Sequence, residues 1–91
     1  MVLVSYDISN NKKRAKFSKY IQKFGERLQY SVYQIENSER ILENIIADLN
    51  NHFLKTFDES DSVYIFKLSA SCEVFKYGYA KHEDDELLIV N

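Results

Sequence analysis

The chain has 91 residues, of which 45% are hydrophobic, which is enough for one small core and excludes a second large domain. Its single cysteine, Cys72, excludes an internal disulfide, and no run of about 18 apolar residues is present that could cross a membrane. The formal net charge of −2 argues against a protein that coats nucleic acid along its whole surface. We therefore expect one cytoplasmic domain over residues 1–91, without membrane contact, that gains stability by self-association.

The first third of the chain predicts a strand, a helix and a second extended segment. Residues 2–6 are mostly apolar, as in a strand in the middle of a sheet. Ser9 or Asn10 can cap a helix that ends at Gly25. The apolar side chains of this helix recur every three or four residues and form one stripe: Phe17, Tyr20, Ile21 and Phe24. Residues 27–35 then alternate between apolar and polar side chains, which is typical of a strand.

A second helix is predicted after Asn37 or Ser38, either of which can cap it. This helix ends near Leu54, and its apolar stripe consists of Leu42, Ile45, Ile46, Leu49 and Phe53. Residues 62–68 are rich in valine, tyrosine, isoleucine and phenylalanine and predict another strand, and residues 73–77 repeat that character. The second half of the chain therefore adds a helix and two strands.

The order of these elements predicts an α+β domain with the ferredoxin-like βαββαβ plan, in which both helices cover one face of the sheet. That plan needs two strands between the helices. Either the run 27–36 bends or breaks near Tyr30 and Ser31, or the plan is wrong. A last apolar segment, Leu87–Val90, follows the acidic run Glu83–Glu86 and is too short to form a strand without a partner.

Charge is divided unevenly along the chain. Residues 1–27 hold seven lysines and arginines and two acidic residues, whereas residues 28–91 hold five and twelve. The basic stretch indicates a local surface for phosphates, and a solvated helix face explains it equally well.

Asp7 ends the first strand directly before the basic helix. A strand end is rigid and exposed, which favours chemistry, while a helix N-cap is an equally good explanation for an aspartate there. Mg²⁺ is often held by one or two carboxylates together with waters and phosphates, and a two-fold dimer would supply a second Asp7. Asp7 is therefore a candidate ligand for Mg²⁺ or Mn²⁺, shared between two subunits.

Other chemical candidates are weaker. His52 and His82 are not spaced with further metal ligands, and Cys72 has no partner that would make it a nucleophile. Core packing explains most of the seven tyrosines and six phenylalanines, although some of them could stack on bases.

Several segments, in their order and spacing over almost the whole chain, resemble the CRISPR-associated Cas2 family. They are Tyr6-Asp7-Ile8 at the strand end, Lys13-Arg14 at the helix start, Lys23-Phe24-Gly25 at its exit, Arg27 to Tyr33, Asp61-Ser62-Val63 and the short C-terminal strand. The resemblance implies a ferredoxin-like homodimer in which the C-terminal segment 80–91 of each subunit extends the other's sheet. Members of this family sit between two dimers of the CRISPR integrase and hold DNA for insertion as a new spacer. Several are also described as metal-dependent endonucleases on RNA or DNA.

Site residues follow from the resemblance position by position. It implies that Asp7 is the catalytic metal ligand. It further implies nucleic-acid contacts by Tyr6, Arg14, Lys16, Arg27, Ser31 and Tyr33. Tyr33 stands where phenylalanine is common, and Gln34 stands where an acid is often found, which weakens the case for a second metal ligand.

Three hypotheses follow. The first is a homodimeric scaffold that binds duplex DNA or RNA and the integrase subunit during spacer acquisition. The second, compatible with the first, is a Mg²⁺-dependent phosphodiesterase built on paired Asp7 carboxylates. The third is a regulatory or protein-interaction module without nucleic-acid binding.

Overall fold

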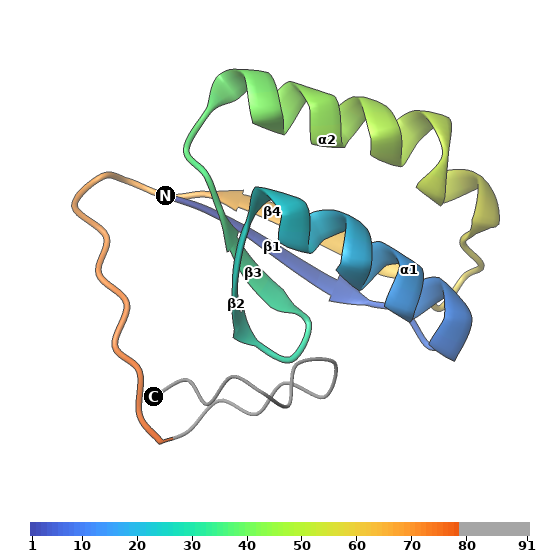
Figure 1. The fold of residues 1–91 in the computed structure, drawn as a ribbon, viewed down its shortest axis with the longest axis horizontal. Coiled ribbons are helices and arrows are strands. Elements are labelled where there is room, and N and C mark those ends of the chain that lie inside the picture. Colours follow the sequence, from blue (N-terminus) through green and yellow to red (C-terminus); the bar gives the residue numbers. More distant parts are fainter. Residues whose placement is uncertain (79–91) are drawn as a thin grey trace.

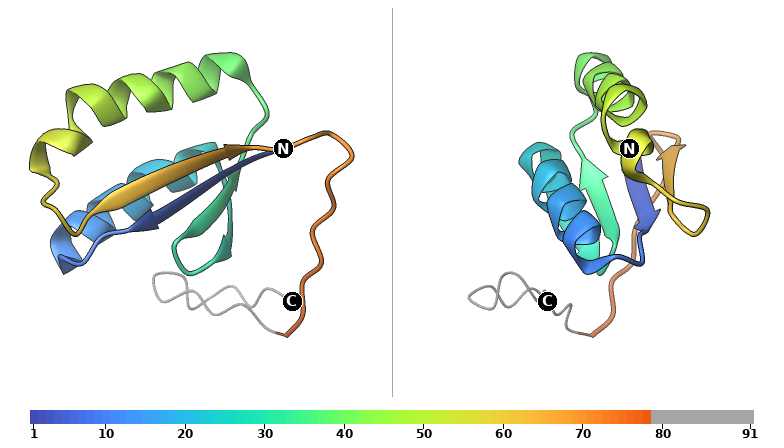
Figure 2. Two further views of the ribbon diagram at one scale, coloured as in Figure 1. Left: turned by 180° about the vertical axis from the view of Figure 1, so that it is seen from behind. Right: turned by 90° about the vertical axis from the view of Figure 1, so that its right-hand side faces the viewer.

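Residues 1–78, which the computed structural model describes, form a four-stranded antiparallel sheet with two α-helices on one face (Figures 1 and 2). The spatial order of the strands is β2-β3-β1-β4. In chain order the elements are β1 (Val2–Asp7), α1 (Asn11–Ile21), η1 (Gln22–Phe24), β2 (Gly25–Gln29), β3 (Val32–Ile35), α2 (Glu39–Asn51), η2 (Phe53–Thr56) and β4 (Ser62–Lys67). This βαββαβ order confirms the predicted ferredoxin-like fold.

The extended run between the helices breaks into β2 and β3 at Tyr30 and Ser31, as the plan requires. Ser31 has a φ of 77°, a left-handed conformation that allows a tight turn. The register shifts between Arg27 and Gln29, so one extra residue is accommodated there as a bulge. The alternation of residues 27–35 therefore does not continue across the turn, and Tyr33 is buried on the core face.

Both helices begin at a predicted cap. The Asn10 side chain accepts a hydrogen bond from the Lys13 amide at 2.9 Å, and the Ser38 hydroxyl accepts one from the Ile41 amide at 3.2 Å. Asn10 is thus the N-cap of α1, so the N-cap explanation for Asp7 is wrong.

The prediction that Gly25 ends the first helix is also wrong. Helix α1 ends at Ile21, and Gly25 is the first residue of β2, with an extended φ of 179°. A Cβ atom at this position would lie 2.0 Å from the carbonyl oxygen of Gln34. Glycine is needed here because the backbone of β3 approaches closely, and not because a helix turns.

The core lies between the sheet and the two helices. Val4, Phe17, Ile21 and Ile45 are fully buried, and they come from β1, α1 and α2. Phe53 packs against this core from η2. Of the predicted helix stripes, Ile46 is the exception, because 41% of its surface is exposed.

The predicted strand at residues 73–77 is absent. Strand β4 ends at Lys67, and residues 68–78 form neither helix nor strand. Phe75 and Tyr77 are 72% and 89% exposed. No described strand lies beside this run, and β-forming side chains alone do not make a strand without a partner. The predicted strand Leu87–Val90 and the rest of segment 80–91 lie outside the described residues.

Among residues 1–78, no helix is long and apolar enough to cross a membrane.

Candidate nucleic-acid interface

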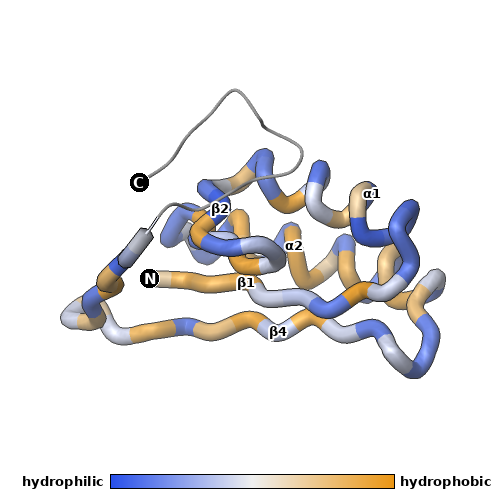
Figure 3. The backbone as a smooth tube through the Cα atoms, turned by 90° about the horizontal axis from the view of Figure 1, so that it is seen from below, coloured by the Kyte–Doolittle hydropathy of each residue, from blue (hydrophilic) through white to orange (hydrophobic). Residues whose placement is uncertain are grey.

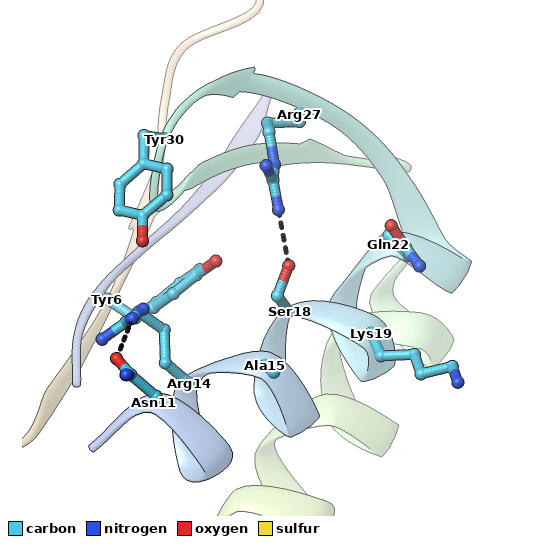
Figure 4. A pocket seen from close by; sticks show the side chains of 9 residues that line it. All are labelled: Tyr6, Asn11, Arg14, Ala15, Ser18, Lys19, Gln22, Arg27 and Tyr30. Carbon is cyan, nitrogen blue, oxygen red and sulfur yellow. Dashed lines mark hydrogen bonds between the residues drawn. The ribbon is translucent and has the colours of Figure 1, made fainter. Parts of the chain in front are cut away.

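A pocket of about 640 Å³ opens between α1 and the β2–β3 hairpin (Figure 4). Among residues 1–78, its lining includes three cationic side chains. The lining residues are Tyr6, Asn11, Arg14, Ala15, Ser18, Lys19, Gln22, Arg27 and Tyr30. Arg14 reaches this pocket from α1 and Arg27 from β2. Two residues that are thirteen positions apart in sequence therefore place their guanidinium groups in one cavity.

Two buried hydroxyl groups orient the Arg27 guanidinium. Its Nη2 donates to Ser18 Oγ at 2.6 Å and to Tyr33 Oη at 2.8 Å, and its Nε donates to Tyr33 Oη at 3.0 Å. The two hydroxyls also lie 2.8 Å from each other. Ser18 and Tyr33 are only 5% and 1% exposed, so the network cannot exchange freely with water. These hydroxyls orient the cation and carry no charge themselves.

Arg14 is tied to the loop between β1 and α1. Its Nη1 donates to the carbonyl oxygens of Ile8 and Ser9, at 3.0 and 3.2 Å, and its Nη2 donates to Asn11 Oδ1. The side chain therefore has a defined position at the mouth of the pocket.

Tyr6 and Ser31 connect β1 to the hairpin. The amide of Tyr6 donates to the carbonyl oxygen of Ser31 at 3.1 Å, across the hairpin turn. The Tyr6 ring is 5% exposed and packs edge-on against Phe17, with ring centroids 5.1 Å apart. Burial raises the pKa of Tyr6, so its hydroxyl stays protonated and lines the pocket as a neutral group.

Asp7 lies on the other side of the sheet. It is the exposed last residue of β1, and it stands opposite Ser62 of β4. Successive strand residues point to opposite faces, and Tyr6 faces the pocket, so Asp7 points away from it. Among residues 1–78 no three His, Cys, Asp or Glu side chains are grouped as a metal site. Within one chain, Asp7 therefore does not meet Arg14 and Arg27.

No helix of residues 1–78 covers the face that carries Asp7. It exposes Tyr64 and Phe66 of β4, by 61% and 44%, and their rings stack with centroids 6.1 Å apart. Leu3 is the register partner of Phe66, which places an apolar side chain of β1 beside them. Figure 3 shows hydrophobic residues along β1 and β4 and mostly hydrophilic residues along α1. We call Leu3, Tyr64 and Phe66 the open-face patch.

The loop before β4 is fastened to the start of α1. Lys13 Nζ lies 3.1 Å from Asp61 Oδ2 and donates to the carbonyl oxygen of Thr56 at 2.7 Å. Asp61 also accepts from the amides of Ser9 and Asp58, at 3.3 and 3.0 Å. The hydrogen bond from the Asp58 amide is the main cause that lowers the pKa of Asp61, and Lys13 adds to it. These contacts hold the loop that follows Asp7.

Lys16 is separated from the pocket that Arg14 and Arg27 line, which we call the arginine pocket. It is exposed on α1, two positions after Arg14, and residues with that spacing point to nearly opposite sides of a helix. Lys16 lines a second groove, between α1 and α2. The structure thus brings Tyr6, Arg14 and Arg27 together, places Ser31 and Tyr33 behind them, and leaves Asp7 and Lys16 elsewhere.

Six of the nine lining residues were not predicted as site residues: Asn11, Ala15, Ser18, Lys19, Gln22 and Tyr30. The sequence carries a signal for Ser18. Ser18 directly follows Phe17 and lies three positions before Ile21, so it is on the apolar face of α1. A hydroxyl group that is buried there needs a hydrogen-bond partner inside the protein.

Residues 1–74 match the family model described as CRISPR associated protein Cas2. The CRISPR-associated endoribonuclease Cas2 of Mycobacterium tuberculosis is 31% identical over 77 residues, which cover 85% of this chain and 65% of that protein, slightly less than two thirds of its length. The CRISPR-associated endonuclease Cas2 2 of Thermus thermophilus is 32% identical over 76 residues, covering 82% of this chain and 80% of that protein.

Solved structures agree with the fold. A hypothetical protein from Thermus thermophilus superposes with a TM-score of 0.65 and 31% identity, covering 85% of this chain and 90% of that one. Streptococcus pyogenes Cas2 at pH 6.5 has the same fold, with a TM-score of 0.60, 22% identity and coverage of 82% and 98%. The sequence match over residues 1–74, together with this fold, shows that the chain belongs to the CRISPR-associated Cas2 family.

Proposed function

We propose that this protein is a homodimeric, duplex-binding scaffold of CRISPR spacer acquisition, which holds DNA for the integrase subunit. The single observation that carries the nucleic-acid part is the pocket in which the guanidinium groups of Arg14 and Arg27 converge from two elements. Membership of the Cas2 family supports the CRISPR-associated role. The partnership with the integrase is proposed in addition.

The chemistry of the pocket suits a backbone phosphate. A guanidinium presents several N–H donors in a plane, which matches the oxygen atoms of a phosphate. Arg27 is oriented in advance by Ser18 and Tyr33, so little side-chain freedom is lost when a phosphate binds. Contacts of this kind position a duplex without reading its sequence.

The proposal is tested by salt dependence. Arg14→Ala and Arg27→Ala should each weaken duplex binding similarly across sequences and reduce the slope of log K against log salt by about 0.9. Arg40→Ala and Lys76→Ala are matched controls, because both residues are exposed and lie outside the pocket. An unchanged slope in the double mutant would instead favour a regulatory or protein-interaction module.

The homodimer is proposed from the open face and the sheet edge. The open-face patch is an apolar surface of the kind that a second subunit covers. Strand β4 is at the edge of the described sheet, so a strand from a partner can add to it. We propose that segment 80–91 of the partner supplies that strand.

A second candidate activity is metal-dependent cleavage of nucleic acid. The names of the relatives, endoribonuclease and endonuclease, favour it, as does the exposed position of Asp7 beside an open face. One carboxylate per chain is a poor site for Mg²⁺ or Mn²⁺, and two Asp7 side chains about a two-fold axis fit better. A bound metal would lower the pKa of a coordinated water and so supply a nucleophile. Asp7 would hold the metal, and the open-face patch would exclude bulk water around it.

A further inference from the structure

A second groove, of about 680 Å³, lies between α1 and the end of α2, on the other side of α1 from the arginine pocket. Its α1 wall presents Lys12, Lys16 and Tyr20, which follow one another at intervals of four residues. Four helical residues rise by about 6 Å, so these side chains form a row along one side of α1. Phosphate binding in the first pocket uses none of them.

The floor of the groove is aromatic, and its Tyr20 and Phe53 rings are inclined at 55° to each other. The Tyr20 and Phe53 rings are in contact, with centroids 4.9 Å apart, and Phe53 packs edge-on against the buried Phe17 at 5.1 Å. Phe57 extends this floor. Phe53 and Phe57 are half-buried, so part of their surface faces the groove.

The groove has cations from the start of α1 and a carboxylate from α2, and its lining also includes Lys13, which is paired with Asp61, together with His52 and Thr56. Lys12 and Lys16 are exposed at the start of α1. Beside Tyr20, which follows Lys16 by one helical turn, Asp48 of α2 accepts a hydrogen bond from the Tyr20 hydroxyl at 2.5 Å. Burial and this hydrogen bond raise the pKa of Tyr20, so its ring remains neutral beside the carboxylate. Cations at the start of α1, an aromatic floor, and a hydrogen-bond acceptor beside Tyr20 follow the order of phosphate, ring and amino edge in a nucleotide.

We propose that this groove binds one nucleotide unit, with its base on Tyr20, Phe53 and Phe57, its phosphate at Lys12 and Lys16, and an exocyclic amine toward Asp48. Base stacking on aromatic side chains tolerates any base, whereas an acceptor such as Asp48 favours bases that carry an amine. The ligand is either a free nucleotide or an unpaired nucleotide of a bound strand. An unpaired nucleotide of a bound strand rests on the proposed function, whereas a free nucleotide does not.

The site is tested with AMP and UMP on the full chain, by following the amide NMR signals of Tyr20, Phe53 and Phe57. The double variant Lys12→Glu with Lys16→Glu should bind AMP about tenfold more weakly or worse. The double variant Arg40→Glu with Lys76→Glu has the same change of charge outside the groove and should bind as the unmodified chain does. The proposal would be overturned if the two double variants lost AMP affinity equally. It would also be overturned if AMP shifted only the amide signals of residues that line the arginine pocket.

The role of Asp48 has its own variant. In Asp48→Asn the amide oxygen still accepts from Tyr20, so the fold is preserved while the charge is lost. The unmodified chain should bind AMP several-fold more tightly than UMP, and the variant should lose most of that preference. Equal binding of the two nucleotides by the unmodified chain would remove the assignment of Asp48. Binding of an acidic, apolar peptide in place of both nucleotides would overturn the nucleotide site.

The source of the nucleotide is resolved by duplexes. A duplex with one unpaired 2-aminopurine should lose emission on binding, and the Lys12→Glu, Lys16→Glu double should restore the emission of the bound duplex. If blunt duplex binds and the emission does not change, the scaffold proposal stands and the strand-borne nucleotide fails. If AMP binds as expected and no duplex binds, the groove stands and the scaffold proposal fails.

Discussion

The two faces of the sheet carry opposite chemistry. On the helix-covered face, Arg27 is a cation held by buried hydroxyls, whereas the open face bears the Asp7 carboxylate beside exposed Tyr64 and Phe66. Tyr6 and Asp7 are adjacent in sequence and nevertheless belong to different faces, because strand side chains alternate. The comparison teaches that the proposed phosphate site and the proposed metal site lie on different faces, so that substitutions on each face test them separately.

The largest effect is expected at the open face. Phe66→Lys would bury an unpaired charge in the proposed dimer, so the variant should be a folded monomer by light scattering at micromolar concentration. Leu54→Lys is the control, because Leu54 is similarly exposed, at 49% against 44%, and lies on η2. Removal of residues 80–91 should also yield monomer or aggregate. Phe66→Lys and truncated chains that both remain well-folded dimers would show that the open face is not the interface.

The next largest effect separates cleavage from binding. Asp7→Asn removes the charge that attracts a divalent ion and keeps the side-chain size, so it should abolish any Mg²⁺- or Mn²⁺-dependent cleavage and preserve the dimer. Duplex affinity should be unchanged or slightly higher, because an anion is lost. Labelled RNA and DNA are incubated with each metal or EDTA, with Glu43→Gln as a control of equal charge change. Cleavage that persists in Asp7→Asn would place the activity outside this residue.

A smaller effect is expected behind the pocket. Tyr33→Phe deletes the hydroxyl that accepts from Arg27 and leaves Ser18 as a partner. Loss of this buried hydrogen bond should lower the free energy of unfolding by about 1 kcal/mol, measured by urea denaturation. Duplex binding should weaken a few-fold, while any Asp7-dependent cleavage of saturating substrate should be unchanged. If Tyr33→Phe reduced both duplex binding and cleavage of saturating substrate, the helix-covered face and the open face would not act independently.

The smallest effect concerns the loop where the two faces meet. Hydrogen bonding lowers the pKa of Asp61 below its ordinary value of 3.8 in the folded state. Its stabilising contribution is therefore present above pH 3.8 and is lost as the pH falls through the lower, folded pKa. Asp61→Asn should flatten the dependence of the melting temperature on pH in this acidic range. Parallel curves for the two chains would assign the acid sensitivity to other carboxylates.

Much of the fold follows from local patterns. The apolar run of β1, the cap at Asn10 and the stripe that contains Phe17 and Ile21 all report on short segments, and they were predicted. The predicted strand at residues 73–77 was wrong, because a strand depends on a partner that composition does not reveal.

The site was less predictable than the fold. The position of Asp7 at the end of β1 was expected, and its separation from the pocket follows from strand alternation once the core face is known. The link from Ser18 to Arg27 and Tyr33 joins an α-helix to two strands, so only the tertiary arrangement places these three groups together. Sequence spacing marks Ser18 as a hydroxyl on the apolar face of α1, but it does not identify Arg27 and Tyr33 as the partners of that hydroxyl.

The close approach of β3 to Gly25 helps to fix the position of the Arg27 guanidinium group. Residue 25 begins β2 only two positions before Arg27, and a methyl group there would collide with the Gln34 carbonyl and push the two strands apart. Its φ is extended, so a stabilisation strategy that replaces glycines wherever backbone angles permit would select this position. The resulting shift would move a guanidinium that Ser18 holds at 2.6 Å. The tolerance of this protein to engineering is therefore lower at Gly25 than its backbone angles indicate.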